Sequence, residues 1–484
     1  MSLSTTLANA LSGLNASSRA ASVVSSNVSN ALTEGYVRRE LNLSPQSLGG
    51  TGAGVRIDGI TRAVNTVVLS DRRLADAEAG GAGIKTDFLA GVEARLGDPE
   101  DAGSLSARLA ALEAALVQAA SRPDSQARLQ GVADAAIAVT DQLNGLTDGI
   151  QQARMDANAG IAKAVGTLND TLGQIDRLNA EILAQRAAGR DATALMDQRQ
   201  GLVDRVAEIV PVREVARDHD QVALYTTGGA ILLEGNPAVI GFTPAGVITA
   251  DMTLGSGALS GLTINGMAVP STDTGVLGGG TLGAMLAVRD DLAPGAQSQI
   301  DALARDLIER FQSSAVDTSL TPGQPGLLTD GGAALNPALE TGLAGRISLN
   351  ALVDPLHGGA LWRLRDGLGA TQPGAAGDAT LLTRLGAALS GTRAPSSGNF
   401  IGAARSASGL AADVLSGIAS ARQQSESREG FAVARQEALT ELQLADGVDT
   451  DAEMQTLLMV EQAYSANARV IQVVDELIQK LIGL

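Results

Sequence analysis

Residues 278–283 form a glycine-rich string that could bind a phosphate group. Their sequence, Gly-Gly-Gly-Thr-Leu-Gly, satisfies the pattern G-x-G-x-x-G, in which glycines let the backbone approach the pyrophosphate of a dinucleotide. That chemistry needs a buried strand before the loop and a strand–helix–strand unit around it. The preceding residues, 270–276, are polar and typical of a turn. We therefore interpret residues 278–283 as a flexible connection between domains and expect no cofactor.

Two acidic groupings could hold a metal ion or relay a proton. Asp449, Asp451 and Glu453 alternate like calcium ligands, but the twelve-residue loop with its central glycine is missing. They stand at the start of a predicted helix, where carboxylates interact favourably with the helix dipole. Residues 218–220, Asp-His-Asp, resemble part of a catalytic relay. They lie between two predicted strands, so an exposed turn is the better interpretation.

Other residue types on which enzymes and metal sites depend are missing or isolated. The chain has no cysteine, which excludes disulfides, thiolate zinc sites and cysteine nucleophiles. Its only histidines, His219 and His357, are 138 positions apart. No G-x-S-x-G or S-x-x-K string marks a serine nucleophile. We therefore expect no catalytic, cofactor-binding or metal-ligating residues, and no enzyme.

Composition restricts the partners of the chain. Its 484 residues include 35 basic and 53 acidic side chains, a net charge of −18, which disfavours nucleic acid because phosphate binding needs basic patches. Only nine residues are aromatic, fewer than a deep ligand pocket normally uses. No apolar run is long enough to insert into a membrane. The N-terminus does not read as a secretory signal, so these rules alone favour the cytoplasm.

Both ends of the chain have the heptad spacing of a coiled-coil seam. Small and apolar side chains recur at alternating steps of four and three, and in the second seam one polar residue interrupts them. The N-terminal seam comprises Leu3, Leu7, Ala10, Leu14, Ser17, Ala21, Val24, Val28 and Ala31. The C-terminal seam comprises Leu457, Val460, Tyr464, Asn467, Ile471, Val474, Ile478 and Leu481. Without further information an ordinary coiled coil within one chain would explain both.

The pattern between the ends predicts a mainly α fold with a β insertion. Helical spacing runs from Leu129 to a stop at Gly189, and short β-branched runs separated by Gly, Asn and Pro follow from 212 to about 276. The terminal helices should form a coiled coil beside a long helical-bundle rod domain and a small antiparallel β domain in the middle. We expect five segments: an N-terminal helix at 1–75, a helical rod at 76–210, a β domain at 211–280, a returning helical domain at 281–445 with an irregular Gly/Pro-rich section at 318–400, and a C-terminal helix at 446–484.

Residues 25–40, SSNVSNALTEGYVRRE, resemble a known signature. It is the Asn-rich motif ending in Thr-x-Gly-Tyr that follows the first helix of flagellar rod, hook and hook-associated proteins. The matching positions are Asn27, Asn30, Thr33, Gly35, Tyr36 and Arg38. Ser26 and Leu32 stand where that family more often has asparagine. The C-terminal residues 458–484 are similar to the shared C-terminal helix, with Tyr464, Asn467 and Ile471 at its most typical positions.

The middle of the chain resembles the FlgK family of hook-associated proteins, at residues 95–116, 196–215 and 281–311. Hook and distal rod proteins turn to β structure soon after the signature, whereas we expect this chain to stay helical to about residue 209. The resemblance implies a structural protein at the hook–filament junction. The alternatives are another axial component (the third hook-associated protein, or a hook or rod protein), a coiled-coil surface adhesin, or a nucleotide-binding enzyme.

The resemblance also implies partners and a location. Family members leave the cell through the flagellar type III apparatus without a cleaved signal, so the chain is expected in the cytoplasm first and in the flagellum, outside the cell, afterwards. Its implied partners are the hook protein, the third hook-associated protein, further copies of itself in a helical or ring-like lattice, and an export chaperone on the C-terminal helix. The implied subunit interface consists of Leu3, Leu7, Leu14, Val24 and Val28 together with the C-terminal seam.

Overall fold

The computed structural model describes residues 3–33, 35–48, 51–400, 402 and 404–483. It confirms a mainly α fold with small antiparallel sheets in the middle of the chain. The chain forms two compact units, which we describe separately. Unit 1 draws on residues 1–77, 167–239 and 432–484, and unit 2 on residues 78–166 and 240–431. The finer division into five segments stays a prediction.

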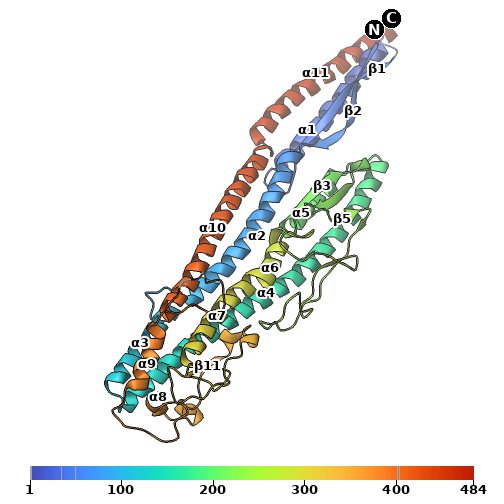
Figure 1. Ribbon diagram of the computed structural model, residues 1–484. Coiled ribbons are helices and arrows are strands. Elements are labelled where there is room, and N and C mark those ends of the chain that lie inside the picture. Colours follow the sequence, from blue (N-terminus) through green and yellow to red (C-terminus); the bar gives the residue numbers. More distant parts are fainter. Residues whose placement is uncertain (1–2, 34, 49–50, 401, 403, 484) are drawn as a thin grey trace. The chain divides into compact units, whose positions relative to one another are not determined.

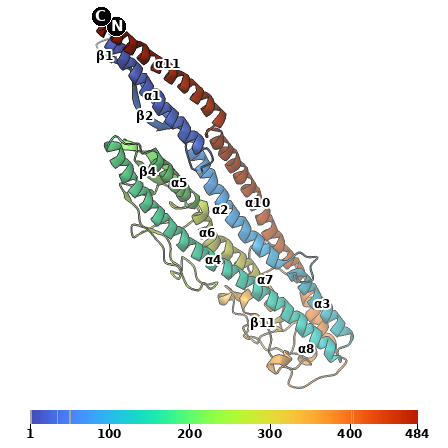
Figure 2. The same ribbon diagram turned by 180° about the vertical axis from the view of Figure 1, so that it is seen from behind.

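Unit 1 contains the two terminal helices and two small sheets (Figures 1 and 2). Strands β1 and β2 form an antiparallel hairpin, and β3, β4, β5 and β6 form a four-stranded antiparallel sheet in that order. Its own elements are α1 (Leu3–Ser29), β1 (Arg39–Leu48), β2 (Thr51–Arg62), α5 (Thr193–Ile209), β3 (Val212–Ala216), η1 (Asp218–Asp220), β4 (Val222–Thr226), β5 (Ile231–Glu234), β6 (Asn236–Pro237) and α11 (Thr450–Ile482).

Unit 2 is a helical core with short strands and turns attached. Its strands pair as β7-β8-β9 and β10-β11, both antiparallel. Its own elements are α3 (Leu105–Ser121), β7 (Ile240–Gly241), β8 (Thr263–Ile264), β9 (Met267–Ala268), α6 (Gly280–Ala287), η2 (Val288–Leu292), α7 (Ala293–Phe311), β10 (Leu328–Asp330), η3 (Pro337–Leu339), η4 (Leu343–Gly345), β11 (Ile347–Leu349), η5 (Pro355–His357), α8 (Arg363–Asp366) and α9 (Thr380–Ser390). Helices α2 (Thr66–Leu96), α4 (Gln126–Ala187) and α10 (Ala407–Ala445) contribute residues to both units.

Helix α4 confirms the long helix that the heptad spacing predicts. Its 62 residues rise roughly 93 Å at 1.5 Å per residue. Gly189, with a φ of +67°, follows its end in the left-handed conformation that glycine adopts at little cost. One heptad position of α4, Ala153, is half-buried. The other heptad positions are buried: Leu129, Val132, Ala136, Val139, Leu143, Leu146, Ile150, Ala157, Ile161, Val165, Leu168, Leu172 and Ile175. No described helix has the length and apolar character needed to cross a bilayer.

The expectation of an all-helical chain before residue 209 is wrong at residues 39–62. These residues form the β1–β2 hairpin, with Arg39 opposite Arg62 and Leu41 opposite Ile60. The signal is present in the sequence, because apolar and polar residues alternate at Leu41-Asn42-Leu43 and again around Ile57. A hairpin after the signature therefore does not separate this chain from hook and rod proteins.

Two buried arginines hold the loop 242–262 against the helices of unit 2. Arg154 on α4 is 1% exposed and donates to the carbonyls of Thr249 (3.0 Å), Met252 (2.6 Å) and Arg289 (3.0 Å). Arg289 itself is 0% exposed and donates to Asn158 Oδ1 and the Ser260 carbonyl, each at 3.1 Å. Because the loop has little regular structure, these side chains supply the donors that a sheet would otherwise provide.

Arg154→Met is expected to lower the free energy of unfolding of unit 2 by about 3 kcal/mol, since it leaves buried carbonyls without donors. Urea unfolding of the full chain measures the loss, and hydrogen exchange should show faster opening of residues 249–252. The matched control is Gln152→Met on the exposed face of α4, where a change within about 0.5 kcal/mol is expected. Unchanged protection of the loop in Arg154→Met would contradict this assignment.

Candidate assembly interface

The first and last helices of the chain pack against each other in unit 1. Helices α1 and α11 run antiparallel, side by side in both views (Figures 1 and 2). Leu7, near the start of α1, lines a depression of about 240 Å³ with Ile471, Val474 and Ile478 of α11. At the opposite end of the pair, Asn27 meets Glu453. The two sequence-predicted seams therefore lie against each other within one chain.

This pairing covers the predicted seams incompletely. Only Val24 and Val474 among the predicted interface residues are buried, at 4% and 3% exposure. Leu7, Tyr464 and Leu481 are exposed. The other predicted interface residues are half-buried: Leu3, Leu14, Val28, Leu457, Val460, Asn467, Ile471 and Ile478. A two-helix pair can shield only one side of each helix, so much of this apolar surface stays open.

Sequence reasoning missed a second apolar row on α11. Each position of this second row stands one residue before a position of the C-terminal seam, so the row has the same heptad spacing. It could therefore have been found in the sequence. Its large side chains, with other apolar residues of α11, are exposed: Met454, Leu458, Met459, Val470, Val473, Leu477 and Ile482. A contiguous apolar surface of this kind marks an interaction site in a soluble protein. Helix α11 thus presents one row to α1 and another to solvent.

The polar residue in the C-terminal seam lies against a glycine of α1. A Cβ atom on Gly13 of α1 would lie 2.7 Å from Asn467 Nδ2 and 2.9 Å from its Cγ. The Asn467 amide donates to the Ala463 carbonyl of its own helix at 3.0 Å. Gly13 therefore provides the space that Asn467 occupies. This explains why a polar side chain is accommodated in an otherwise apolar seam.

The signature residues form a hydrogen-bonded cluster around Asn27, which is 0% exposed. Asn27 Nδ2 donates to the Arg39 carbonyl (2.9 Å) and to Glu453 Oε1 (3.0 Å). Asn27 Oδ1 accepts from the Tyr36 hydroxyl (2.8 Å) and the Arg39 amide (3.0 Å). Both amide protons and both lone pairs are thus used. The cluster joins the end of α1, the start of β1 and the first turn of α11.

The remaining signature residues shape the turn that leads into this cluster. Asn30 Nδ2 donates to the Ser26 carbonyl (2.9 Å), and the Thr33 hydroxyl lies 3.4 Å from Asn30 Oδ1. Gly35 has a φ of +76°, a conformation that favours glycine. Arg38 Nη1 is 3.8 Å from Glu453 Oε1. The turn therefore brings the Tyr36 hydroxyl to Asn27 and Arg38 close to Glu453 of α11.

Glu453 has a role that its position in the sequence does not indicate. Asp449 caps α11, accepting from the amides of Asp451 (2.9 Å) and Ala452 (3.1 Å), as the helix-dipole interpretation predicts. Glu453, by contrast, is 6% exposed and accepts from Asn27. A partner 426 positions away leaves no local signal, so sequence reasoning could not find this contact.

The β1–β2 hairpin connects α1 to α5. The Val55 amide donates to Ser12 Oγ at 3.2 Å, which places β2 on α1. At the base of the hairpin, Arg62 Nε is 2.6 Å from Asp197 Oδ1 on α5, and Arg39 Nη2 is 3.5 Å from Asp197 Oδ2. Burial raises the pKa of the Asp197 carboxyl, although both arginines oppose this effect. The hairpin is thus fixed at both ends.

The candidate chemical sites have structural roles. The described strand before this string, β9, is two exposed residues long and ends ten positions before Gly278. Helix α6 begins within the string, at Gly280, so no buried strand leads directly into the glycines as a dinucleotide site requires. A Cβ on Gly278 would lie 2.2 Å from the Asp273 carbonyl oxygen, and one on Gly81 of α2 would lie 2.8 Å from the Gly280 carbonyl oxygen. The glycines therefore permit a tight turn against α2. Residues 218–220 form an exposed turn, with positive φ at His219 and Asp220.

Comparisons with known proteins point to flagellar components. The description "Flagellar hook-associated protein FlgK helical domain" matches residues 89–326, "Flagellar basal body rod FlgEFG protein C-terminal" matches 445–484, and "Flagella basal body rod protein" matches 7–36. Flagellar hook-associated protein 1 of Bacillus subtilis is 24% identical over 518 residues, covering 99% of this chain and 97% of that protein.

Other similarities cover less. Flagellar hook-associated protein 1 of Salmonella typhimurium is 26% identical over 243 residues, which is 49% of this chain and 44% of that protein. This chain thus spans about half the length of the Salmonella relative. The hook junction protein FlgK from Burkholderia pseudomallei has a TM-score of 0.44 at 21% identity, over 54% of this chain and 47% of that one.

Asn27→Ala is expected to release the start of α11 from α1, because it removes the donor to the buried Glu453 carboxylate and the acceptor of the Tyr36 hydroxyl. We expect a loss of about 3 kcal/mol in unit 1 and faster hydrogen exchange at residues 450–456. Asn15→Ala, on the exposed face of the same helix, is the control and should change stability by less than about 0.5 kcal/mol. Equal exchange rates in the two variants would show that Asn27 does not hold α11.

Proposed function

Because the chain belongs to the family of flagellar hook-associated protein 1, we propose that it is a structural subunit of the bacterial flagellum that joins the hook to the filament. The observation that carries this proposal is the α1–α11 pair, which buries one side of each terminal helix and leaves long apolar rows open. Such rows suit a subunit whose terminal helices pack against those of its neighbours.

The choice of the hook–filament junction rests on the middle of the chain. The rod-type matches at residues 7–36 and 445–484 fit several axial components, and the β1–β2 hairpin does not separate them. The helical-domain match at 89–326 favours a hook-associated protein over a hook or rod protein. It also disfavours a surface adhesin or a nucleotide-binding enzyme. We propose that the chain has no catalytic activity.

The proposed partners are the other components of the flagellum. They comprise the hook protein on one side, the third hook-associated protein on the other, and further copies of this chain in a helical or ring-like lattice. The chain would leave the cell through the flagellar export apparatus and fold outside. A strain that lacks the gene should keep its hook but lose its filament, and the wild-type chain should restore the filament. A strain without it that still grows filaments would refute the proposal.

Val28→Asp or Ile478→Asp is expected to abolish filament growth while leaving unit 2 folded. Both side chains are half-buried in the α1–α11 pair and would be fully enclosed among neighbouring subunits, where an unpaired charge costs several kcal/mol. Electron microscopy of complemented deletion strains gives the readout, and circular dichroism checks the fold. Ser18→Asp, on the exposed face of α1, is the control. Normal motility in both variants would mean that these rows do not form the junction.

Removal of residues 455–484 is expected to eliminate binding of an export chaperone. The exposed apolar row of α11 would aggregate in the cytoplasm unless it were covered, and an amphipathic helix suits recognition in a groove. Titration calorimetry of the chaperone against the full and truncated chains measures the loss, with circular dichroism confirming the helices of residues 80–440. Equal affinity for the two chains would place the chaperone site elsewhere.

A further inference from the structure

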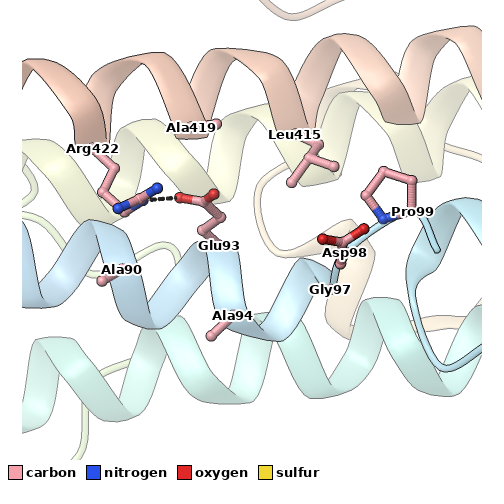
Figure 3. Close-up of a pocket in the computed structure, with 9 residues that line it drawn as sticks. All are labelled: Ala90, Glu93, Ala94, Gly97, Asp98, Pro99, Leu415, Ala419 and Arg422. Carbon is pink, nitrogen blue, oxygen red and sulfur yellow. Dashed lines mark hydrogen bonds and ion pairs between the residues drawn. The ribbon is translucent and has the colours of Figure 1, made fainter. Parts of the chain in front are cut away.

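A groove in unit 2 lies between α2 and α10 and has a volume of about 420 Å³. Figure 3 shows its two walls, with Ala90 and Ala94 on α2 and Leu415 and Ala419 on α10. Three of these four side chains are alanines, too short to fill the space between the helices. An apolar cavity of about 150 Å³ can hold a benzene ring. The groove is therefore wide enough for an aromatic side chain.

The two ends of the groove differ in charge. At one end Glu93 pairs with Arg422 (Figure 3). Arg422 also pairs with Glu426. At the other end Asp98 is exposed and forms no ion pair with any described residue. Its carboxylate accepts only the Glu100 amide, at 3.0 Å. The open end of the groove thus has an unpaired negative charge beside an apolar surface.

Phe431 on α10 combines an apolar ring with a neighbouring positive charge, which complements the apolar groove and its negative end. It is 80% exposed, whereas the other four phenylalanines of the chain are buried or half-buried. One turn earlier, Arg428 is exposed and forms no ion pair among the described residues. An exposed aromatic ring beside an arginine is typical of the residues that dominate protein interfaces. Phe431 is also more exposed than Tyr464, at 44%, which is the other exposed aromatic side chain among the described residues.

Phe431 cannot reach the groove of its own chain. It follows Arg422, which lines the groove, by nine positions on the same helix. Nine positions are about two and a half turns, so Phe431 lies on the opposite side of α10. A groove of this kind that receives Phe431 would therefore belong to another molecule. The net charge of −18 opposes self-association in general, so two copies would need a local match of opposite charges such as Arg428 with Asp98.

We propose that Phe431 of one copy of this chain inserts between Ala94 and Leu415 of a second copy, with Arg428 beside Asp98. The two patches are different surfaces of the same molecule, so the contact is heterologous and generates a ring or an open helix instead of a closed dimer. This inference rests on the proposed function as a self-assembling subunit. It adds a subunit contact that is independent of the terminal helices.

The absence of cysteine from the chain makes a direct test possible, because introduced thiols are the only ones present. Full-length Ala94→Cys and Phe431→Cys variants are mixed over a concentration series and oxidised, and the cross-linked dimer is measured by electrophoresis. The mixture should yield at least tenfold more dimer than either variant alone. Val117→Cys, 63% exposed on α3 outside the groove, replaces Ala94→Cys as the control. Equal yield with Val117→Cys, or efficient coupling of Phe431→Cys to itself, would overturn the proposal.

A charge exchange tests the second part of the contact. Adding Arg428→Glu to the Phe431→Cys chain should reduce cross-linking severalfold, and adding Asp98→Arg to the Ala94→Cys chain should restore it. Failure of the second change to restore the yield would exclude the Arg428–Asp98 match.

The same thiol pair in one chain, oxidised in detached flagella, should give a ladder of linked subunits. If flagella assemble from this chain but give no ladder, the contact is wrong and the proposed function still holds. If the purified chain gives a ladder but does not restore filaments in the deletion strain, the contact holds and the proposed function is wrong.

Discussion

The structure of unit 1 depends on the contact between the two ends of the chain. Asn27 and Glu453 are 426 positions apart, and their hydrogen bond is buried. Closing a loop of that length costs roughly 5 kcal/mol in chain entropy, which one hydrogen bond cannot offset. The apolar side chains of α1 and α11 that pack beside this hydrogen bond therefore supply most of the free energy that holds the two ends together. Tyr36 and Arg39 then complete the environment of Asn27, so the signature turn and the hairpin are ordered by the same cluster.

The incomplete burial of the terminal helices follows from their number. A pair of helices shields about half of each surface, whereas α11 is apolar over more than that. Val474 is buried, but Val470, Val473 and Leu477 are exposed on the same helix. The exposed apolar row of α11 would gain burial by packing against further helices. Under the proposed function, that burial supplies free energy for assembly.

The sequence predicts the regular parts of this fold well and the contacts between distant parts poorly. The heptad spacing of α4 and the terminal helices is local, repeats many times and survives a few mismatches, so α4 ends where Gly189 predicts. The hairpin at 39–62 was missed because its alternation is short and interrupted by polar residues and glycines. Arg154, Arg289 and Glu453 gave no usable signal, because each finds its partners in segments far along the chain. The second row on α11 could have been found, since it repeats the first at an offset of one.

Buried polar groups also account for the specificity of this structure. Leucine and alanine dominate the helical cores, and such side chains pack almost equally well after a helix shifts by one turn. Asn27 on Glu453, Asn467 against Gly13, and Arg154 on three carbonyls each have partners in one register only. A shift of α11 by one turn would leave Glu453 buried without a donor and place a larger side chain against Gly13. We infer that these few polar contacts select one arrangement among several of similar apolar burial. A subunit of a regular lattice needs that selectivity, since an error in register would be repeated in every contact between neighbours.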